Sequence, residues 1–134
     1  MILGIGIDSV DVKRFATWSS YNQKILLRIF SEQEIDYCLQ TPAKTAERFA
    51  VRFAAREAFY KALSMYQPEH TVPFLSLCRL ITIEKHKNNS PYLIVDWEQI
   101  TSYHPIRPAE TLLSLTHTQQ IATAFVILQG PRSP

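Results

Sequence analysis

A sixteen-residue stretch, Arg48–Leu63, contains neither glycine nor proline and constrains the fold of this chain more than any other segment. Glycine and proline are the residues that most often interrupt helices. Apolar residues within the stretch recur at spacings of three and four, which places them on one stripe of an α-helix. We expect a long helix over residues 43–65, with the core of the protein formed against it.

The polar residues of this helix admit two interpretations. Glu57 lies within the apolar stripe, where an unpaired carboxylate would cost several kcal/mol to desolvate. Arg48, Arg52 and Arg56 follow one another at i,i+4 steps, and Lys61 lies one turn after Glu57. The segment is either an ordinary amphipathic helix with a solvated arginine face and an internal Glu57–Lys61 ion pair, or part of a functional site built around a buried charge.

Composition favours one globular domain over residues 1–134. Apolar residues make up 46% and charged residues 19% of the chain, and no repeat is visible. The net charge of +2 is too small to suggest a general nucleic-acid binder. Residues 1–63 hold nine Lys and Arg against seven Asp and Glu, whereas residues 64–134 hold five of each. The basic excess therefore lies in the N-terminal half, where it could meet an acidic partner or a phosphate.

The cysteines and the N-terminus indicate a cytoplasmic protein without a membrane anchor. Cys38 and Cys78 lie forty residues apart, outside any pattern typical of metal ligands, and are expected to be buried, reduced thiols. The apolar run over residues 1–7 follows no basic segment and ends at Asp8. It is too short for a signal peptide or a membrane span.

Periodicity and turn residues place helices early in the chain and strands late. Helices are expected over 11–18, 22–30, 31–40 and 43–65, and strands over 2–10, 77–85, 92–97, 111–118 and 120–128. Loops are expected over 67–73, 87–91 and 98–110, followed by a frayed tail over 130–134. The order predicts an α+β fold in which the long helix packs on an antiparallel sheet.

The first strand has one face without bulky side chains. Period-two alternation places Gly4, Gly6 and Asp8 on this face. Glycines in a strand favour close approach of another backbone, a helix or a ligand. A dinucleotide-binding fingerprint is excluded, because the third glycine and a suitably placed helix are missing. Asp8 either ends the strand and caps the next helix or belongs to a site.

Three elements offer polar groups that folding does not require. They are Asp8 at the end of a strand, Glu57 with Lys61 on the long helix, and His117 at the tip of the last hairpin. Two carboxylates without a Cys/His cluster suit a hard cation such as Mg²⁺. With Lys61, Arg52 and His117 added, the set is typical of a diphosphate site. The chain contains no P-loop or kinase motif, so phosphoryl chemistry would use a metal and side-chain cations.

Four motifs in order along nearly the whole chain resemble one known family. They are Gly4–Val10 with Arg14-Phe15, Phe30–Glu34, Arg52–Leu63 and Ser114–His117. Together they resemble the holo-acyl-carrier-protein synthases, the small bacterial 4′-phosphopantetheinyl transferases. The resemblance implies magnesium-dependent transfer of the phosphopantetheine arm of coenzyme A to a serine of apo acyl carrier protein, with release of adenosine 3′,5′-bisphosphate. It also implies a homotrimer with active sites between subunits.

The resemblance assigns roles to individual positions. Asp8 and Glu57 would hold magnesium against the coenzyme A diphosphate, and Lys61 would neutralise the phosphates. The residues expected to contact coenzyme A are Lys61, Arg52, Ser64 and His117, and those expected to meet the acidic carrier protein are Arg14, Lys24 and Arg28. The carrier serine would attack the β-phosphate and lose its hydroxyl proton either to Glu57 or to a water on the metal.

The chain departs from the family pattern at several positions. Arg56 stands where lysine is usual, Ser64 where glycine is usual, Thr116 where serine is common, and Asn89-Ser90 where Gly-Lys is typical. Contacts between residues 67 and 89 are therefore not transferred from the family. A second hypothesis is a non-catalytic module of the same fold that binds a carrier protein or a nucleotide. A nucleic-acid binder is disfavoured, because aromatic residues are not interleaved with the basic ones.

Overall fold

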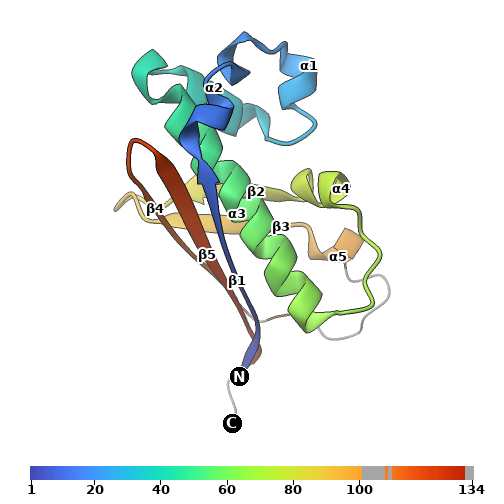
Figure 1. Cartoon of the computed structure of the whole chain (residues 1–134). Helices are drawn as coiled ribbons and strands as arrows, with labels where there is room; N and C mark the ends of the chain where they lie inside the picture. Colours follow the sequence, from blue (N-terminus) through green and yellow to red (C-terminus); the bar gives the residue numbers. More distant parts are fainter. Residues whose placement is uncertain (101–107, 109, 132–134) are drawn as a thin grey trace.

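The structure is a computed structural model that describes residues 1–100, 108 and 110–131. The long helix α3 (Thr45–Tyr66) runs diagonally through the molecule, against a three-stranded antiparallel sheet (Figure 1). The strands of this sheet are β1 (Ile2–Asp11), β5 (Ile121–Gln129) and β4 (Glu110–His117), in the spatial order β1-β5-β4. A separate antiparallel pair is formed by β2 (Ile81–Lys85) and β3 (Pro91–Val95). The predicted α+β fold, with a long helix on an antiparallel sheet, is confirmed.

The remaining elements are short. They are the 3₁₀ helices η1 (Val12–Phe15), η2 (Trp18–Ser20) and η3 (Pro42–Lys44) and the helices α1 (Gln23–Leu26), α2 (Glu32–Leu39), α4 (Phe74–Cys78) and α5 (Trp97–Ile100). The continuous helices expected over 11–18 and 22–30 are therefore wrong in extent. Tertiary packing decides this region, since Phe15 and Trp18 turn inward and place their rings 5.5 and 5.9 Å from that of Phe53.

The C-terminal half contains two helices that the sequence did not indicate. The strand expected from residue 77 begins at Ile81, because α4 occupies the preceding residues. Helix α5 takes the start of the loop expected over 98–110, and the rest of that loop lies outside the described residues, apart from Pro108 and Glu110. The end of the expected tail, residues 132–134, also lies outside them.

Two glycines of β1 bring this strand onto α3. A Cβ atom at Gly4 would overlap the carbonyl oxygen of Ala62, and one at Gly6 would overlap that of Ala58. The approaching group is thus the backbone of α3, one of the alternatives that the glycines suggested. Both alanines are fully buried in the same interface. This contact fixes the direction of β1 along α3 and determines what the next residue on that face, Asp8, can reach.

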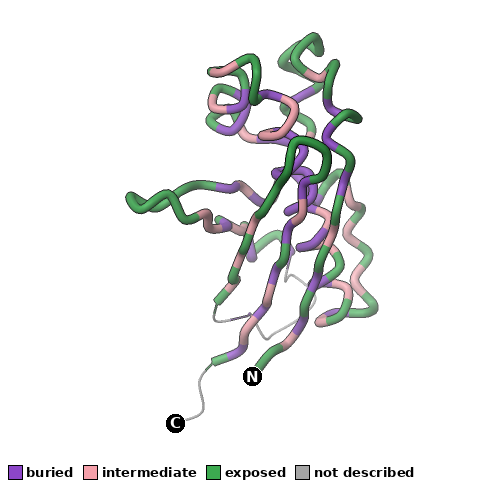
Figure 2. Tube along the Cα trace, turned by 60° about the vertical axis from the view of Figure 1, so that its left-hand side comes forward, coloured by how far each residue is buried: buried purple, intermediate pink, exposed green. Residues whose placement is uncertain are grey.

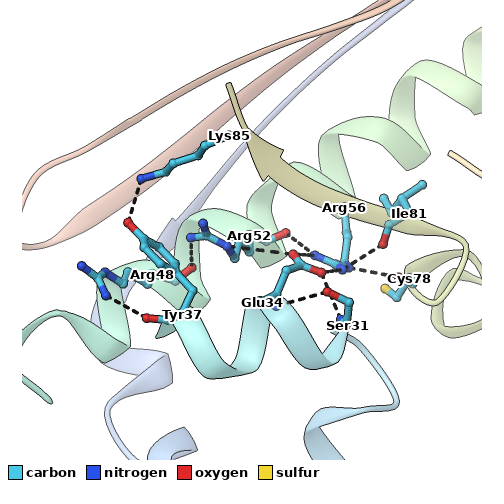
Figure 3. Close-up of polar contacts among 9 residues, drawn as sticks. All are labelled: Ser31, Glu34, Tyr37, Arg48, Arg52, Arg56, Cys78, Ile81 and Lys85. Atoms are coloured by element: carbon cyan, nitrogen blue, oxygen red, sulfur yellow. Dashed lines mark hydrogen bonds and ion pairs between the residues drawn. The ribbon is translucent and has the colours of Figure 1, made fainter. Parts of the chain in front are cut away.

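The middle of α3 is buried, so of the two interpretations of this helix the solvated arginine face is wrong. Arg56 is completely buried and Arg52 is 5% exposed, because α2 packs on this side of the helix and Arg56 also reaches the backbone of Cys78 and Ile81. Figure 3 shows Arg56 aimed at Glu34, with both carboxylate oxygens accepting hydrogen bonds at 2.6 and 2.9 Å. Its other N–H groups reach the carbonyl oxygens of Cys78 and Ile81 at 3.1 and 3.0 Å. The guanidinium is therefore fully engaged.

Glu34 has a second role at the start of α2. The Glu34 side chain accepts a hydrogen bond from the backbone N–H of Ser31 at 3.0 Å. The Ser31 hydroxyl in turn accepts a hydrogen bond from the backbone N–H of Glu34 at 3.2 Å. This capping box satisfies donors at the first turn of α2. Burial alone would raise the pKa of Glu34, but the charge and hydrogen bonds of Arg56 outweigh it and lower the pKa. The helix cap and the buried ion pair therefore share one ionised carboxylate.

The outer face of the three-stranded sheet carries exposed apolar side chains. Ile5 and Ile7 on β1 are 43% and 58% exposed, and Leu112 on β4 and Phe125 on β5 are 43% and 38% exposed. Strand register brings these residues together, since Ile7 pairs with Phe125 and Ile5 with Ile127, which in turn pairs with Leu112. Figure 2 shows buried residues alternating with less buried ones along β5 and much of β1, and intermediate residues alternating with exposed ones along β4. Among the described residues, no helix is long and apolar enough to cross a membrane.

Candidate active site

Asp8 and Lys61 meet where β1 crosses α3. The ammonium group of Lys61 donates to Asp8 Oδ1 at 3.0 Å and to the backbone oxygen of Ile7 at 2.9 Å. The Asp8 side chain is 11% exposed, whereas that of Lys61 is 55% exposed. The internal ion pair expected between Glu57 and Lys61 is thus replaced by an ion pair between strand and helix. The closeness of β1 to α3, set by Gly4 and Gly6, makes this contact possible.

Glu57 lies beside Asp8 and is difficult to ionise in the isolated chain. Partial burial is the largest cause that raises the pKa of Glu57 to about 7, and a hydrogen bond to Asp8 and the negative charge of Asp8 add to it. The charges of Arg14 and Lys61 act in the opposite direction. Two carboxylates that compete for ionisation are typical of a site that holds a proton or a cation between them.

The carboxylate pair fits a magnesium ion. Asp8 Oδ2 is buried and, when Glu57 is ionised, accepts no hydrogen bond from the described residues. Within the described residues no cluster of three or more His, Cys, Asp or Glu side chains is suited to a metal. Magnesium is commonly held by one or two carboxylates and completes its octahedron with water and phosphate oxygens. Asp8 and Glu57 are the residues that would hold it.

A small cleft opens beside these groups. It has a volume of about 180 Å³ and is lined by Glu57, Tyr60, Lys61 and Phe74. The rings of Tyr60 and Phe74 pack edge to face at 5.6 Å and form one wall. A larger cavity of about 750 Å³ lies at the end of α3, and none of Asp8, Glu57 and Lys61 lines it. The candidate site is therefore the small cleft, because Glu57 and Lys61 line it.

Two of the residues expected at the diphosphate lie elsewhere in the subunit. Arg52 faces α2, where its guanidinium lies 4.6 Å from the centre of the Tyr37 ring and 4.0 Å from Glu34 (Figure 3). His117, at the end of β4, lies 3.7 Å from Glu47 in the first turn of α3. Ten residues of helix separate Glu47 from Glu57, a rise of about 15 Å. Within one subunit neither Arg52 nor His117 joins the Asp8–Glu57–Lys61 group.

Comparison with known proteins identifies the family. A family model described as the 4′-phosphopantetheinyl transferase superfamily matches residues 4–125. The chain belongs to this superfamily. The match includes Asp8, Glu57, Lys61 and His117, and the resemblance drawn from the four sequence motifs is confirmed.

Relatives and solved structures agree over nearly the full length of the transferase chain. The holo-[acyl-carrier-protein] synthase of Treponema denticola is 36% identical over 130 residues, which are 97% of this chain and 100% of that protein. The corresponding synthase of Trichlorobacter lovleyi is 35% identical over 133 residues, or 98% of this chain and 100% of that protein. A crystal structure of a holo-(acyl-carrier-protein) synthase from Bacillus anthracis in complex with CoA (3',5'-ADP) is 26% identical, with a TM-score of 0.75, and covers 98% of this chain and 99% of that chain.

The transferase fold also brings residues to the site that sequence reasoning missed. Tyr60 was assigned to the apolar stripe, although its position three residues after Glu57 already placed it on the same helix face. Phe74 reaches the cleft from α4, an element with no clear sequence signal. Arg14, expected only at the carrier surface, lies with its guanidinium 5.8 Å from the ring centre of Phe53 and acts on the pKa of Glu57.

Proposed function

We propose that this transferase is a holo-[acyl-carrier-protein] synthase, which moves the 4′-phosphopantetheine group of coenzyme A to a serine of apo acyl carrier protein. The observation that carries the proposal is the pairing of Asp8 with Glu57 beside Lys61, in a chain of this superfamily. Two carboxylates and one ammonium group suit a bound diphosphate with its cation. The synthase names of the full-length relatives support the same reaction.

Magnesium is the proposed cofactor, with Asp8 and Glu57 as its protein ligands. Asp8 Oδ2 lacks a hydrogen-bond partner among the described residues when Glu57 is ionised, and the pKa of Glu57 is raised to about 7 when no cation is present. When bound, the ion would supply positive charge that offsets the negative charge of the diphosphate in the transition state.

The proposed mechanism assigns separate tasks to the residues of the cleft. Lys61 binds a phosphate oxygen and stabilises the charge that moves onto the leaving nucleotide. The carrier serine forms the new P–O bond to the β-phosphorus as the bond to the bridging oxygen of adenosine 3′,5′-bisphosphate breaks. Glu57 or a water molecule beside it would accept the serine proton as the new bond forms.

A homotrimer is part of the proposal. The exposed apolar face of β1, β5 and β4 supports it, because contiguous apolar surface of this kind is typical of subunit interfaces. The placement of His117 also supports it, since this exposed residue is separated from Lys61 within one subunit. With sites between subunits, His117 would contact coenzyme A bound by the carboxylates of an adjacent subunit, whereas Arg52 is buried against Glu34 and would stabilise the fold instead.

Phe125→Lys is expected to convert the trimer to monomers, because it places a charge in the middle of the exposed apolar face. Size-exclusion chromatography with light scattering measures the change. Leu75→Lys, at a 59% exposed residue of α4 away from this sheet, is the matched control and should stay trimeric. A wild-type protein that is monomeric at micromolar concentration would contradict the proposed assembly.

The carrier protein is proposed to dock on the segment that contains α1. Lys24 and Arg28 are exposed there, and Ile25 between them is 42% exposed. Exposed cations around an apolar side chain suit an acidic, amphipathic helix of a partner. Arg14, which is also exposed, extends this basic surface toward Glu57.

Arg28→Glu is expected to raise KM for the carrier protein about fivefold to tenfold while leaving KM for coenzyme A unchanged. Arg28 gives a cleaner test than Arg14, because the charge of Arg14 also affects Glu57. Steady-state kinetics at several salt concentrations separate the two constants, since screening should reduce the difference from wild type. Equal changes in both KM values would refute the docking role.

The proposed function is tested by the release of adenosine 3′,5′-bisphosphate from coenzyme A. The synthase should release it only when apo carrier protein and magnesium are both present, in equal amount to the holo carrier protein formed. The alternative, a non-catalytic module of the same fold, predicts binding of carrier protein or nucleotide without release. Nucleotide release that occurs without carrier protein would contradict both.

The remaining sequence expectations are kept as proposals. We propose that residues 1–134 act as one catalytic domain and that the protein works in the cytoplasm, without nucleic-acid or membrane partners. Cys38 and Cys78 are free and buried, which suits a reducing compartment. Burial raises the pKa of these thiols to about 12 and about 11, so both stay protonated and unreactive.

A further inference from the structure

A serine and a histidine form a hydrogen-bonded pair next to Tyr60, between the small cleft that Tyr60 lines and the larger cavity that the histidine lines. The loop after α3 folds back so that His70 Nε2 lies 2.9 Å from the hydroxyl oxygen of Ser64, in the last turns of the helix. The backbone N–H of Val72 donates to His70 Nδ1 at 3.3 Å. The imidazole also packs edge to face on Tyr60, with 5.3 Å between ring centres. Three contacts therefore hold a loop histidine in one orientation.

The contact with Val72 decides which ring nitrogen carries the proton. A backbone N–H can only donate, so Nδ1 of His70 is the acceptor and the neutral ring carries its proton on Nε2. Nε2–H consequently donates to Ser64, and the hydroxyl hydrogen of Ser64 remains available for another acceptor. Partial burial lowers the pKa of His70, which favours this neutral form.

The direction of this hydrogen bond excludes Ser64 as a nucleophile activated by His70. In a serine–histidine catalytic pair the imidazole accepts the hydroxyl proton, which needs an unprotonated Nε2. Here Nε2 donates instead. The Ser64 hydroxyl is thus arranged as a hydrogen-bond donor to something outside the pair.

Ser64 continues the row of functional side chains along α3. It lies three residues after Lys61 and seven after Glu57, so all three share one helix face. The rise from Lys61 to Ser64 is about 4.5 Å, so the hydroxyl lies about one helical turn beyond the ammonium group on the same face. A donor at this place is suited to an anionic oxygen of a ligand that extends from Lys61 along α3.

We propose that His70 is a positioning residue that turns the Ser64 hydroxyl toward the diphosphate of coenzyme A. The inference rests on the proposed function and adds to it a residue from the loop after α3. A hydrogen bond from a neutral hydroxyl to a phosphate oxygen is charge-assisted and therefore stronger than a neutral pair. No proton is transferred, because both groups act only by donating hydrogen bonds.

Calorimetric titration with coenzyme A and magnesium, without carrier protein, tests this role. Ser64→Ala and His70→Ala should each weaken binding about tenfold. The double variant should bind no more weakly than Ser64→Ala, since His70 acts through the hydroxyl. His70→Gln, whose amide N–H can replace Nε2–H, should recover binding to within about threefold of wild type. Thr71→Ala, at an exposed residue of the same loop, is the control and should bind as wild type.

Three outcomes would overturn the inference. They are additive losses in the double variant, failure of His70→Gln to recover binding, and a His70→Ala variant that loses thermal stability but keeps its affinity. Each of these leaves the proposed function standing, provided that the wild-type protein binds coenzyme A. A folded wild-type protein that binds no coenzyme A would overturn the proposed function and this inference together.

Discussion

Glu57→Gln should lower kcat for phosphopantetheine transfer about 10³-fold while leaving the protein folded. The substitution barely changes volume but removes the charge that would hold magnesium and a candidate acceptor of the serine proton. Asp8 would be left as the remaining carboxylate of the pair, with Oδ1 bound to Lys61. Steady-state kinetics with coenzyme A and apo carrier protein measure the loss, and circular dichroism checks the fold.

The same variant should keep or raise the melting temperature. This direction distinguishes it from a substitution that merely disrupts the fold, which would lower the melting temperature. Because the folded-state pKa of Glu57 is about 7, above the usual value of 4.5, the wild-type protein loses stability as pH rises through this range. Without magnesium at pH 8, Glu57→Gln should therefore melt at the same temperature as wild type or higher. Glu69→Gln, at an exposed residue of the loop after α3, is the matched control for both measurements. An active Glu57→Gln variant would refute the assigned role.

Arg56→Leu should lower the free energy of unfolding by about 3–5 kcal/mol, the typical cost of removing one partner of a buried ion pair. Glu34 would keep its buried charge, and the carbonyl oxygens of Cys78 and Ile81 would lose their donor. Urea denaturation at fixed protein concentration measures the change, since an oligomer gains stability with concentration.

Two further variants distinguish a lost ion pair from a packing defect. Arg56→Lys keeps the charge but not the forked geometry, so it should be less destabilising than Arg56→Leu. Glu34→Gln combined with Arg56→Leu removes the unpaired charge and should recover part of the loss. The pair contributes stability above the unfolded-state pKa of Glu34, and this contribution disappears as pH falls through its lowered folded-state pKa. A loss below about 1 kcal/mol in Arg56→Leu would contradict a stabilising role for the pair.

Features set by neighbouring residues could be predicted from the sequence. The glycine face of β1, the capping box of α2 and the extent of α3 all follow from local spacing. The buried pair Glu34–Arg56 could not be predicted in this way, because its residues lie 22 positions apart. Periodicity alone assigned Arg56 to solvent, since it does not reveal which neighbouring element covers a helix face. Helices α4 and α5 are too short for a periodic signal.

The site shows the same division. Asp8, Glu57 and Lys61 were singled out because their charges stood in apolar or glycine-rich surroundings, and the structure brings them together. Of the two interpretations of Glu57 and Lys61, the internal ion pair is not the one observed, since helix spacing allowed Glu57 as the partner of Lys61 while strand packing supplied Asp8. Arg52 and His117 lie in segments that match the family motifs but not at the cleft. Sequence spacing within a motif does not reveal which way a side chain is turned by its neighbours in the fold.

The most direct test of the proposed synthase activity is the intact mass of apo acyl carrier protein after incubation with this protein and coenzyme A, with and without magnesium. We predict a magnesium-dependent gain of ~340 Da, the mass of one phosphopantetheine arm moved by a single phosphoryl transfer. The gain should disappear with Glu57→Gln and persist with Glu69→Gln. An unchanged mass, with folded protein and several carrier proteins tried, would contradict the synthase and favour the binding module.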